Sequence, residues 1–212
     1  MNTLLRSALG TLVLGALSAV AQAGAVFTFQ EIAGNVVMTS SGSVDTDDLV
    51  LQQNESSWGG IGVEQNGNHD IMGGTSVGQV DISFGFHAGT NFSAWAAANG
   101  PFTQSRFDAA VTSGARGFTT YVRPAGIQLP GLGVERADIV GGIWTPDQVW
   151  SYTSETFLSL GLVTGTYTVT DAVTGEFLTI QIGDTRQVPL PLPLGLLAIG
   201  ALALGAASRT RK

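Results

Sequence analysis

Few residues in this sequence have the types and the spacing that catalysis or metal binding requires. The only two histidines are His69, which precedes Asp70 in a polar loop, and His87, which follows an apolar run. Beside a carboxylate, either could bind a metal ion or act in a Ser/His/Asp arrangement. The sequence contains neither a Gly-x-Ser-x-Gly nor a His-Glu-x-x-His motif, however. We therefore favour two unrelated histidines at loop or strand ends, and we predict no catalytic residues and no enzymatic activity.

Carboxylates are densest at Asp45, Asp47 and Asp48. Hard cations such as Ca²⁺ need several oxygen ligands, and acids two positions apart are typical of the start of a calcium loop. The twelfth position of such a loop is Ser56, where an EF-hand requires Glu. We expect either a weak calcium site at these three residues or a solvated turn whose carboxylates accept local backbone amides. No other cofactor is expected.

A second pair of carboxylates, Glu135 and Asp138, flanks Arg136. Paired carboxylates hydrolyse glycosidic bonds when they lie about 5 to 9.5 Å apart. Residues this close within one short segment rarely achieve that arrangement by themselves. We therefore expect a surface ion-pair cluster here.

Three of the tryptophans stand in contexts that could suit a ligand. Trp58 lies beside Gly59-Gly60, where exposure is favoured, and Trp144 and Trp150 bracket a Pro-Asp turn. Exposed aromatic rings stack on sugar rings, so these residues could form a glycan-binding surface. The alternative is that they pack in a core or at a sheet edge, since large aromatic side chains dominate the energetics of cores.

The elements that would position these residues are mostly strands. The composition outside the two ends is rich in Gly, Thr, Ser and Val, and apolar residues alternate clearly with others over 77–86. Two runs on either side of the loop 171–175 predict a hairpin closed by Gly175. The predicted strands are 25–32, 35–39, 61–64, 77–86, 117–122, 137–144, 165–170 and 176–182. Short strands with Gly-rich turns predict an all-β fold, a single β-sandwich-like or jelly-roll-like domain.

Helix is scarce between the two ends. Residues 93–98 are too short to form a helix alone, and 154–160 could form one turn. Residues 146–152 could form another, since Thr145 would cap a first-turn proline. Longer helices are expected only at the termini, one in the signal segment and one in the hydrophobic C-terminal segment.

Residues 1–23 have the layout of a signal peptide. Arg6 supplies a positive charge, and an apolar stretch runs from Leu9 to Val20. Ala21 and Ala23 then form the small-x-small pattern that a signal peptidase cleaves, which predicts a cut before Gly24.

Residues 188–212 have the layout of a membrane-held sorting segment. The apolar run from Leu194 to Ala207 has 14 residues. As a helix it would cover roughly 21 Å, short of the roughly 30 Å hydrocarbon core. The cations Arg209, Arg211 and Lys212 predict that this end stays in the cytoplasm. The segment is therefore either a stable anchor or a temporary one that is removed during sorting.

This tail resembles the PEP-CTERM sorting signal, in the variant of the VPLPA type. The matching motif is Val188, Pro189, Leu190 and Pro191, followed by the apolar run and the basic cluster. The resemblance implies recognition by an exosortase-type membrane protease, cleavage near the Pro-Leu motif, and export to the surface or extracellular matrix of a Gram-negative bacterium. Leu192-Pro193 follows where the usual variant has a small residue, which leaves the cut position open. Segments 27–49 and 156–183 are also similar to the opening and closing segments of many PEP-CTERM surface proteins.

Removing both ends leaves residues 24–187, a size that suits one domain with a real core. Five arginines and no lysine then stand against all 16 acidic residues, a net charge of −11. Such a surface argues against nucleic acid as a partner. The absence of cysteine excludes thiol catalysis and Cys-based metal sites.

The expected function is that of a non-enzymatic cell-surface or extracellular-matrix protein, with a carbohydrate-binding module as the alternative. The expected partners are signal peptidase and an exosortase-type protease during export, and the inner membrane transiently. The carbohydrate-binding alternative would add an exopolysaccharide.

Overall fold

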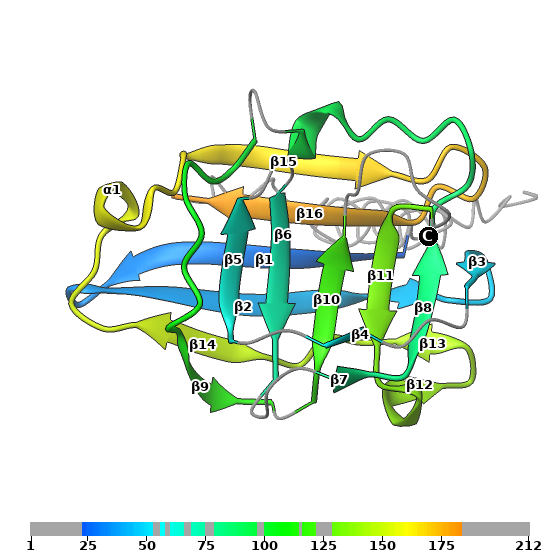
Figure 1. Ribbon diagram of the computed structural model, residues 1–212, viewed down its shortest axis with the longest axis horizontal. Helices are drawn as coiled ribbons and strands as arrows, with labels where there is room; N and C mark the ends of the chain where they lie inside the picture. The colour runs from blue at the N-terminus through cyan, green and yellow to red at the C-terminus, as the bar shows by residue number, and fades with distance from the viewer. Residues whose placement is uncertain are drawn as a thin grey trace, which may run out of the picture.

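Strands form almost all of the regular structure in the computed structural model, which describes residues 23–52, 56–57, 60–65, 69–74, 79–96, 100–114, 116–121 and 129–183. Two main sheets pack face to face, and their strands run crosswise in Figure 1, those of the larger sheet horizontal and those of the smaller sheet upright. The predicted all-β, sandwich-like class is confirmed. The predicted terminal helices lie outside the described residues.

The larger sheet has its first and last strands side by side at its centre. Its order is β12-β13-β2-β1-β16-β15, and β14 pairs with both β2 and β9. β1 pairs antiparallel with β2 and parallel with β16. The bounds are β1 (Gly24–Ile32), β2 (Asn35–Asp45), β9 (Ala110–Ser113), β12 (Ile139–Val140), β13 (Ile143–Trp144), β14 (Val149–Tyr152), β15 (Gly165–Thr170) and β16 (Phe177–Ile182).

The smaller sheet is antiparallel and has the order β3-β8-β11-β10-β6-β5. Its strands are β3 (Val50–Leu51), β5 (Gly62–Gln65), β6 (His69–Gly73), β8 (Ile82–Gly85), β10 (Phe118–Tyr121) and β11 (Gly131–Val134). A two-stranded ribbon joins β4 (Ser56–Ser57) and β7 (Gln79–Val80). The described helices are short: the 3₁₀ helices η1 (Ser93–Trp95) and η2 (Arg136–Asp138), and α1 (Phe157–Leu160). None of these has the length and apolar character needed to cross a bilayer.

Aromatic side chains between the two sheets form the centre of the core. On β1 the alternating residues Ala25, Phe27 and Phe29 are fully buried, as strand geometry requires of one face. The ring of Phe27 stacks on that of Phe118 in the opposite sheet, with centroids 5.2 Å apart. Phe29 contacts the edge of Trp150 at 5.6 Å. The core therefore ties the two sheets together near the middle of β1.

Several sequence predictions hold in detail. β15 and β16 form the predicted hairpin, and Gly175 takes a left-handed φ of 83° in its loop. The predicted apolar face over 77–86 is buried at Val80, Ile82, Phe84 and Phe86.

Three predictions need correction. The strand predicted over 77–86 is divided at Asp81 into β7 and β8. The strand predicted over 137–144 is a 3₁₀ turn followed by a tight hairpin, because Gly141 and Gly142 both take left-handed φ values. Residues 149–152 form a strand instead of the helical turn predicted over 146–152, because β2 and β9 pair with β14 on its two sides.

Candidate functional site

The two histidines lie in different surroundings. His69 begins β6 and is fully buried, and its Nδ1 accepts a hydrogen bond from the Phe102 amide at 3.3 Å. The prediction of a polar loop at His69 is wrong, because this strand pairs with β5 and β10 inside the smaller sheet. His87 follows β8, and its side chain is 31% exposed and lies against Asp171.

The His87–Asp171 pair ties two loops together. The His87 amide donates to Asp171 Oδ2 at 2.6 Å, and the ring Nδ1 lies 3.1 Å from the same oxygen. The other oxygen, Oδ1, accepts the amides of Val173 and Thr174 in the β15–β16 loop at 2.8 and 2.9 Å. Burial alone would raise the pKa of Asp171, but the donors outweigh it and lower that pKa to about 2.

A carboxylate on Nδ1 is how a catalytic histidine is oriented in a hydrolase. Within the described part of the chain, however, no serine or threonine hydroxyl hydrogen-bonds to the His87 ring. The two Asp171 carboxylate oxygens instead accept backbone amides, those of Val173 and Thr174 in the turn and that of His87. The pair therefore acts as a clamp on the end of the hairpin.

In the turn after β2, an acidic side chain accepts a local backbone amide, as expected for a solvated turn. Asp45 Oδ1 accepts the amide of Asp47 at 3.0 Å, and the amide of Asp45 donates to Glu176 Oε2 at 3.0 Å. Asp47 and Asp48 are exposed. Among the described residues, no group of three or more acidic or histidine side chains is placed to hold a metal ion. The calcium site at Asp45, Asp47 and Asp48 stays a prediction without geometric support.

Two of the three tryptophans predicted to bind glycan are buried. Trp144 is 2% exposed and lies 5.6 Å from the Phe118 ring, and Trp150 is fully buried between Phe29 and Tyr152. Neither presents a ring face to solvent, so the prediction is wrong for these two, and core packing is the correct alternative. Trp58 lies outside the described residues.

The carboxylates Glu135 and Asp138 pair with Arg116 and not with their neighbour Arg136. Arg116 Nε lies 2.8 Å from Asp138 Oδ1, and its Nη1 lies 3.9 Å from Glu135 Oε2. Burial raises the pKa of Asp138. The expected ion-pair cluster is confirmed, with a different arginine. It borders a pocket of about 190 Å³, smaller than the roughly 300 Å³ at which ligand sites usually begin.

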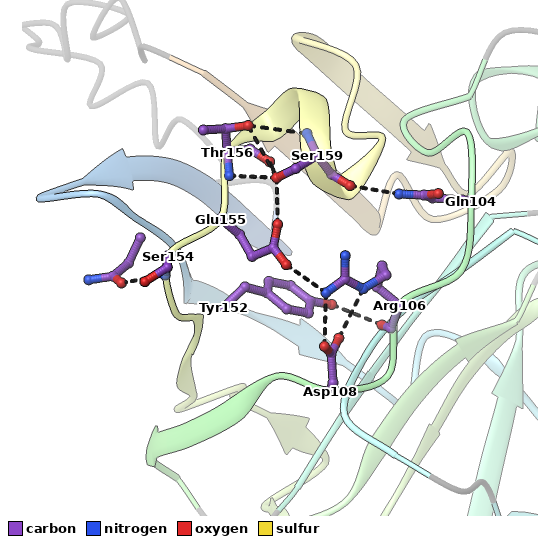
Figure 2. Close-up of polar contacts among 9 residues, drawn as sticks. Gln104, Arg106, Asp108, Tyr152, Ser154, Glu155, Thr156 and Ser159 are labelled. Carbon is purple, nitrogen blue, oxygen red and sulfur yellow. Dashed lines mark hydrogen bonds and ion pairs between the residues drawn. The ribbon is translucent and has the colours of Figure 1, made fainter.

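A dense polar cluster joins the segment 104–108 to the connection between β14 and α1 (Figure 2). We call Arg106, Asp108, Tyr152, Glu155 and Ser159 the Arg106 clasp. Arg106 Nη2 lies 2.8 Å from Asp108 Oδ2 and 2.9 Å from Glu155 Oε1. The guanidinium also lies 5.8 Å from the centre of the Tyr152 ring, close enough for a cation–π contact.

Backbone contacts of the neighbouring residues hold Arg106 and Tyr152 of the clasp in position. Arg106 is held by a pair of backbone hydrogen bonds with Val63, each 2.8 Å. Beside it, Gly62 has a φ of 149°, and a Cβ there would collide with the Arg106 carbonyl and the Tyr152 hydroxyl. Tyr152 ends β14, and its hydroxyl donates to the Arg106 carbonyl at 2.9 Å.

On the other side of the clasp, a capping box begins α1. The Thr156 hydroxyl accepts the Ser159 amide at 3.1 Å, and the Ser159 hydroxyl accepts the Thr156 amide at 2.8 Å. The Ser159 hydroxyl also lies 2.5 Å from Glu155 Oε2, to which it donates. The short helix and the ion pairs therefore hold each other in place.

The electrostatics of the clasp are those of a structural contact. Hydrogen bonds from Arg106 lower the pKa of Asp108, and hydrogen bonds from Ser159 and Arg106 lower that of Glu155. Burial raises the pKa of Tyr152. Both carboxyl groups are therefore charged and the phenol is neutral near pH 7. A carboxylate with a lowered pKa is a weaker general base than an ordinary one.

Sequence reasoning missed the clasp because its halves are 49 residues apart along the chain. One signal was available: in so acidic a chain, each arginine is expected to find a carboxylate. The Thr-x-x-Ser spacing at 156–159 was a second signal, since it resembles a capping box.

The predicted signal and sorting residues Ala21, Val188, Pro189, Leu190, Pro191, Arg209, Arg211 and Lys212 lie outside the described residues. Ala23 is described and directly precedes β1. Comparison of the chain with family models, with curated proteins and with solved structures found no match.

Proposed function

We propose that this chain is an exported cell-surface or extracellular-matrix protein whose β domain works without catalysis. A signal peptide at 1–23 would start its export, and a tail at 188–212 of the PEP-CTERM type would direct its sorting by an exosortase-type protease. One observation carries the proposal. β1 begins at Gly24, directly behind the predicted cut, and β16 ends at Ile182, just before the predicted sorting motif. The strands thus fill the interval between the two signals.

The polar clusters support a role as a stable module. Arg106, Arg116 and Asp171 each hold together segments that are distant along the chain. The carboxylates in these contacts serve as fixed acceptors, which suits a rigid exported domain without disulfides.

Intact-mass measurement tests the sorting proposal. Protein recovered from the cell exterior should lack residues 1–23 and the part of the chain that follows the Pro-Leu motif. Retention of Lys212 would show a stable anchor and contradict removal by a sorting protease. Retention of Met1 would contradict export through a cleaved signal peptide.

The carbohydrate-binding alternative now depends on Trp58, since Trp144 and Trp150 are in the core. Affinity electrophoresis of the secreted protein in gels containing exopolysaccharide tests it. We expect equal migration of the wild type and the Trp58→Ala variant, and retardation of the wild type alone would overturn that expectation. The strand pairing does not support the jelly-roll-like connectivity. The parallel β1–β16 pair is not a feature of an all-antiparallel jelly roll.

A further inference from the structure

An open groove lies at the end of the larger sheet where β1 and β16 finish. It has a volume of about 520 Å³ and is lined by Gln30, Glu31, Ile32, Phe157, Thr164 and Gly183. That volume is within the range of about 300–1,000 Å³ that holds ligands. In Figure 1 the arrowheads of β1 and β16 and the coil of α1 lie together at the left end of the molecule. We call this feature the terminal groove.

Apolar side chains in and beside the terminal groove are exposed. Ile32 in its wall is 48% exposed, and Leu158, the residue after Phe157 on α1, is 91% exposed. Val163, next to the lining residue Thr164, is 40% exposed. Exposed apolar side chains beside a groove are a surface on which another segment or molecule can bury apolar area.

We propose that the terminal groove binds the chain's own segment 184–193. Gly183 is the last residue that the structure describes, and it lines the groove. Its amide donates to the Phe29 carbonyl at 3.0 Å, which fixes the point from which the chain continues. Residue 184 is joined covalently to a residue of the groove, so the segment is present there at a far higher effective concentration than any separate partner.

The composition of this segment matches the lining. Its second half, Val188 to Pro193, alternates three prolines with apolar side chains. Such a sequence prefers the extended polyproline II conformation and docks on aromatic and aliphatic surfaces at low entropic cost. The exposed Ile32 and the half-buried Phe157 ring offer such a surface.

Charge complements the apolar contact. Arg186 lies three residues after Gly183, a reach of about 10 Å in an extended chain. Glu31 lies in the groove wall, and its Oε1 already accepts the Phe157 amide at 2.6 Å. The Glu31 carboxylate is the acceptor that we assign to Arg186.

Docking would govern access to the Pro-Leu motif. A protease that cuts near this motif would act only on chains in which the segment has left the groove. This consequence rests on the proposed function, whereas the docking itself does not.

Paired cysteines test the docking, because the chain has no cysteine of its own. The full chain in detergent would carry Ile32→Cys with Leu190→Cys. The control would carry Val173→Cys, 68% exposed in the loop at the other end of the hairpin, with the same Leu190→Cys. Under mild oxidation we expect the first pair to form an intramolecular disulfide at least about tenfold faster than the control. Equal rates, or disulfides only between two chains, would overturn the proposal. So would a disulfide lost when vesicles of phosphatidylethanolamine and phosphatidylglycerol replace the detergent, since lipid would then be the occupant.

Trypsin cleavage after Arg186 gives a second measurement on the full chain. Ile32→Ser should speed this cut about fivefold, while Val140→Ser, a change at a 77% exposed valine on β12, should leave it unchanged. Equal cleavage of all three proteins would contradict docking. Neither measurement depends on sorting, and the mass of the exported protein does not depend on docking, so the two proposals can fail separately.

Discussion

At the scale of single residues, Arg106 and Arg116 and the carboxylates that pair with them lie where loops meet. Arg106 contacts Asp108 and Glu155 on two different segments, and Arg116 contacts the 3₁₀ turn at Asp138. Exposed ion pairs add little stability individually. Their main effect here is to fix the relative positions of segments that no strand pairing joins.

Replacing Arg106 with Met should lower the free energy of unfolding by about 1 kcal/mol. The side chain is 24% exposed, which limits the contribution of its ion pairs, but the variant also loses the contact with the Tyr152 ring. Urea denaturation at pH 7 measures the difference. Arg136→Met is the matched control, because the described hydrogen bond of Arg136 comes from its main chain. Equal effects of the two substitutions would show that the clasp contributes nothing specific.

Asp171 should make stability depend on pH in acid. Its pKa falls from an ordinary 3.8 to about 2 on folding. A carboxyl group whose pKa is lowered in the folded state adds stability that is complete above about pH 4 and disappears as the pH falls toward 2. Asp171→Asn should therefore cost about 2 kcal/mol at pH 6 and much less at pH 2. Guanidinium denaturation at both pH values measures this, and a cost independent of pH would refute the assignment.

At the scale of elements, the structure divides into parts that local patterns predict and parts that they do not. The residue pattern along single segments predicted β1 and the β15–β16 hairpin, and β1 buries its alternate residues Ala25, Phe27 and Phe29. β14 was missed because Pro146 and Asp147 favour a helix start, while pairing with β2 and β9 decides the outcome. The parallel β1–β16 pair joins opposite ends of the domain, and side-chain alternation carries no information on partners that far apart.

The same reasoning explains what could be predicted of the candidate site. The charges of Glu135 and Asp138 were enough to predict that they form ion pairs. Their partner could not be predicted, because Arg116 lies in another loop. The burial of Trp144 and Trp150 could not be predicted from the local sequence. It depends on the pairing of β13 and β14 with β2, which is distant along the chain.

Phe27 on β1 should be among the costliest residues to truncate. It is fully buried and stacks on Phe118 across the two sheets. Phe27→Ala should lower the free energy of unfolding by about 3–5 kcal/mol, from lost burial and the cavity left behind. Ile32→Ala, on the same strand but 48% exposed, should cost less than about 1 kcal/mol. Denaturant titrations at low temperature compare the two, and a similar cost for both would contradict the assigned core.

At the scale of the whole molecule, the domain is closed by its last strand. β16 lies between β1 and β15, and it supplies the buried residues Leu178, Ile180 and Ile182. Without β16, the edge of β1 and the core beneath it would be open to water.

A chain that ends at Asp171 should therefore fail to fold cooperatively. A chain that ends at Gly183, which keeps β16 and removes only the residues after it, should unfold cooperatively like the full chain. Thermal unfolding followed by near-UV circular dichroism distinguishes the two. Cooperative unfolding of the shorter chain would show that β16 is dispensable for the core.

The parallel alignment of β1 and β16 also sets the polarity of the domain. Both strands run in the same direction, so the chain enters the domain at one end of the sheet and leaves it at the other. Gly24 pairs with Phe177 and Phe29 pairs with Ile182, so the entry and the exit lie five residues apart along the sheet, which is roughly 17 Å at about 3.3 Å per residue. A domain tethered through its carboxyl end would thus display its amino end outward. An epitope fused before Gly24 would therefore lie at the end of the β1–β16 pair that is opposite to the tether.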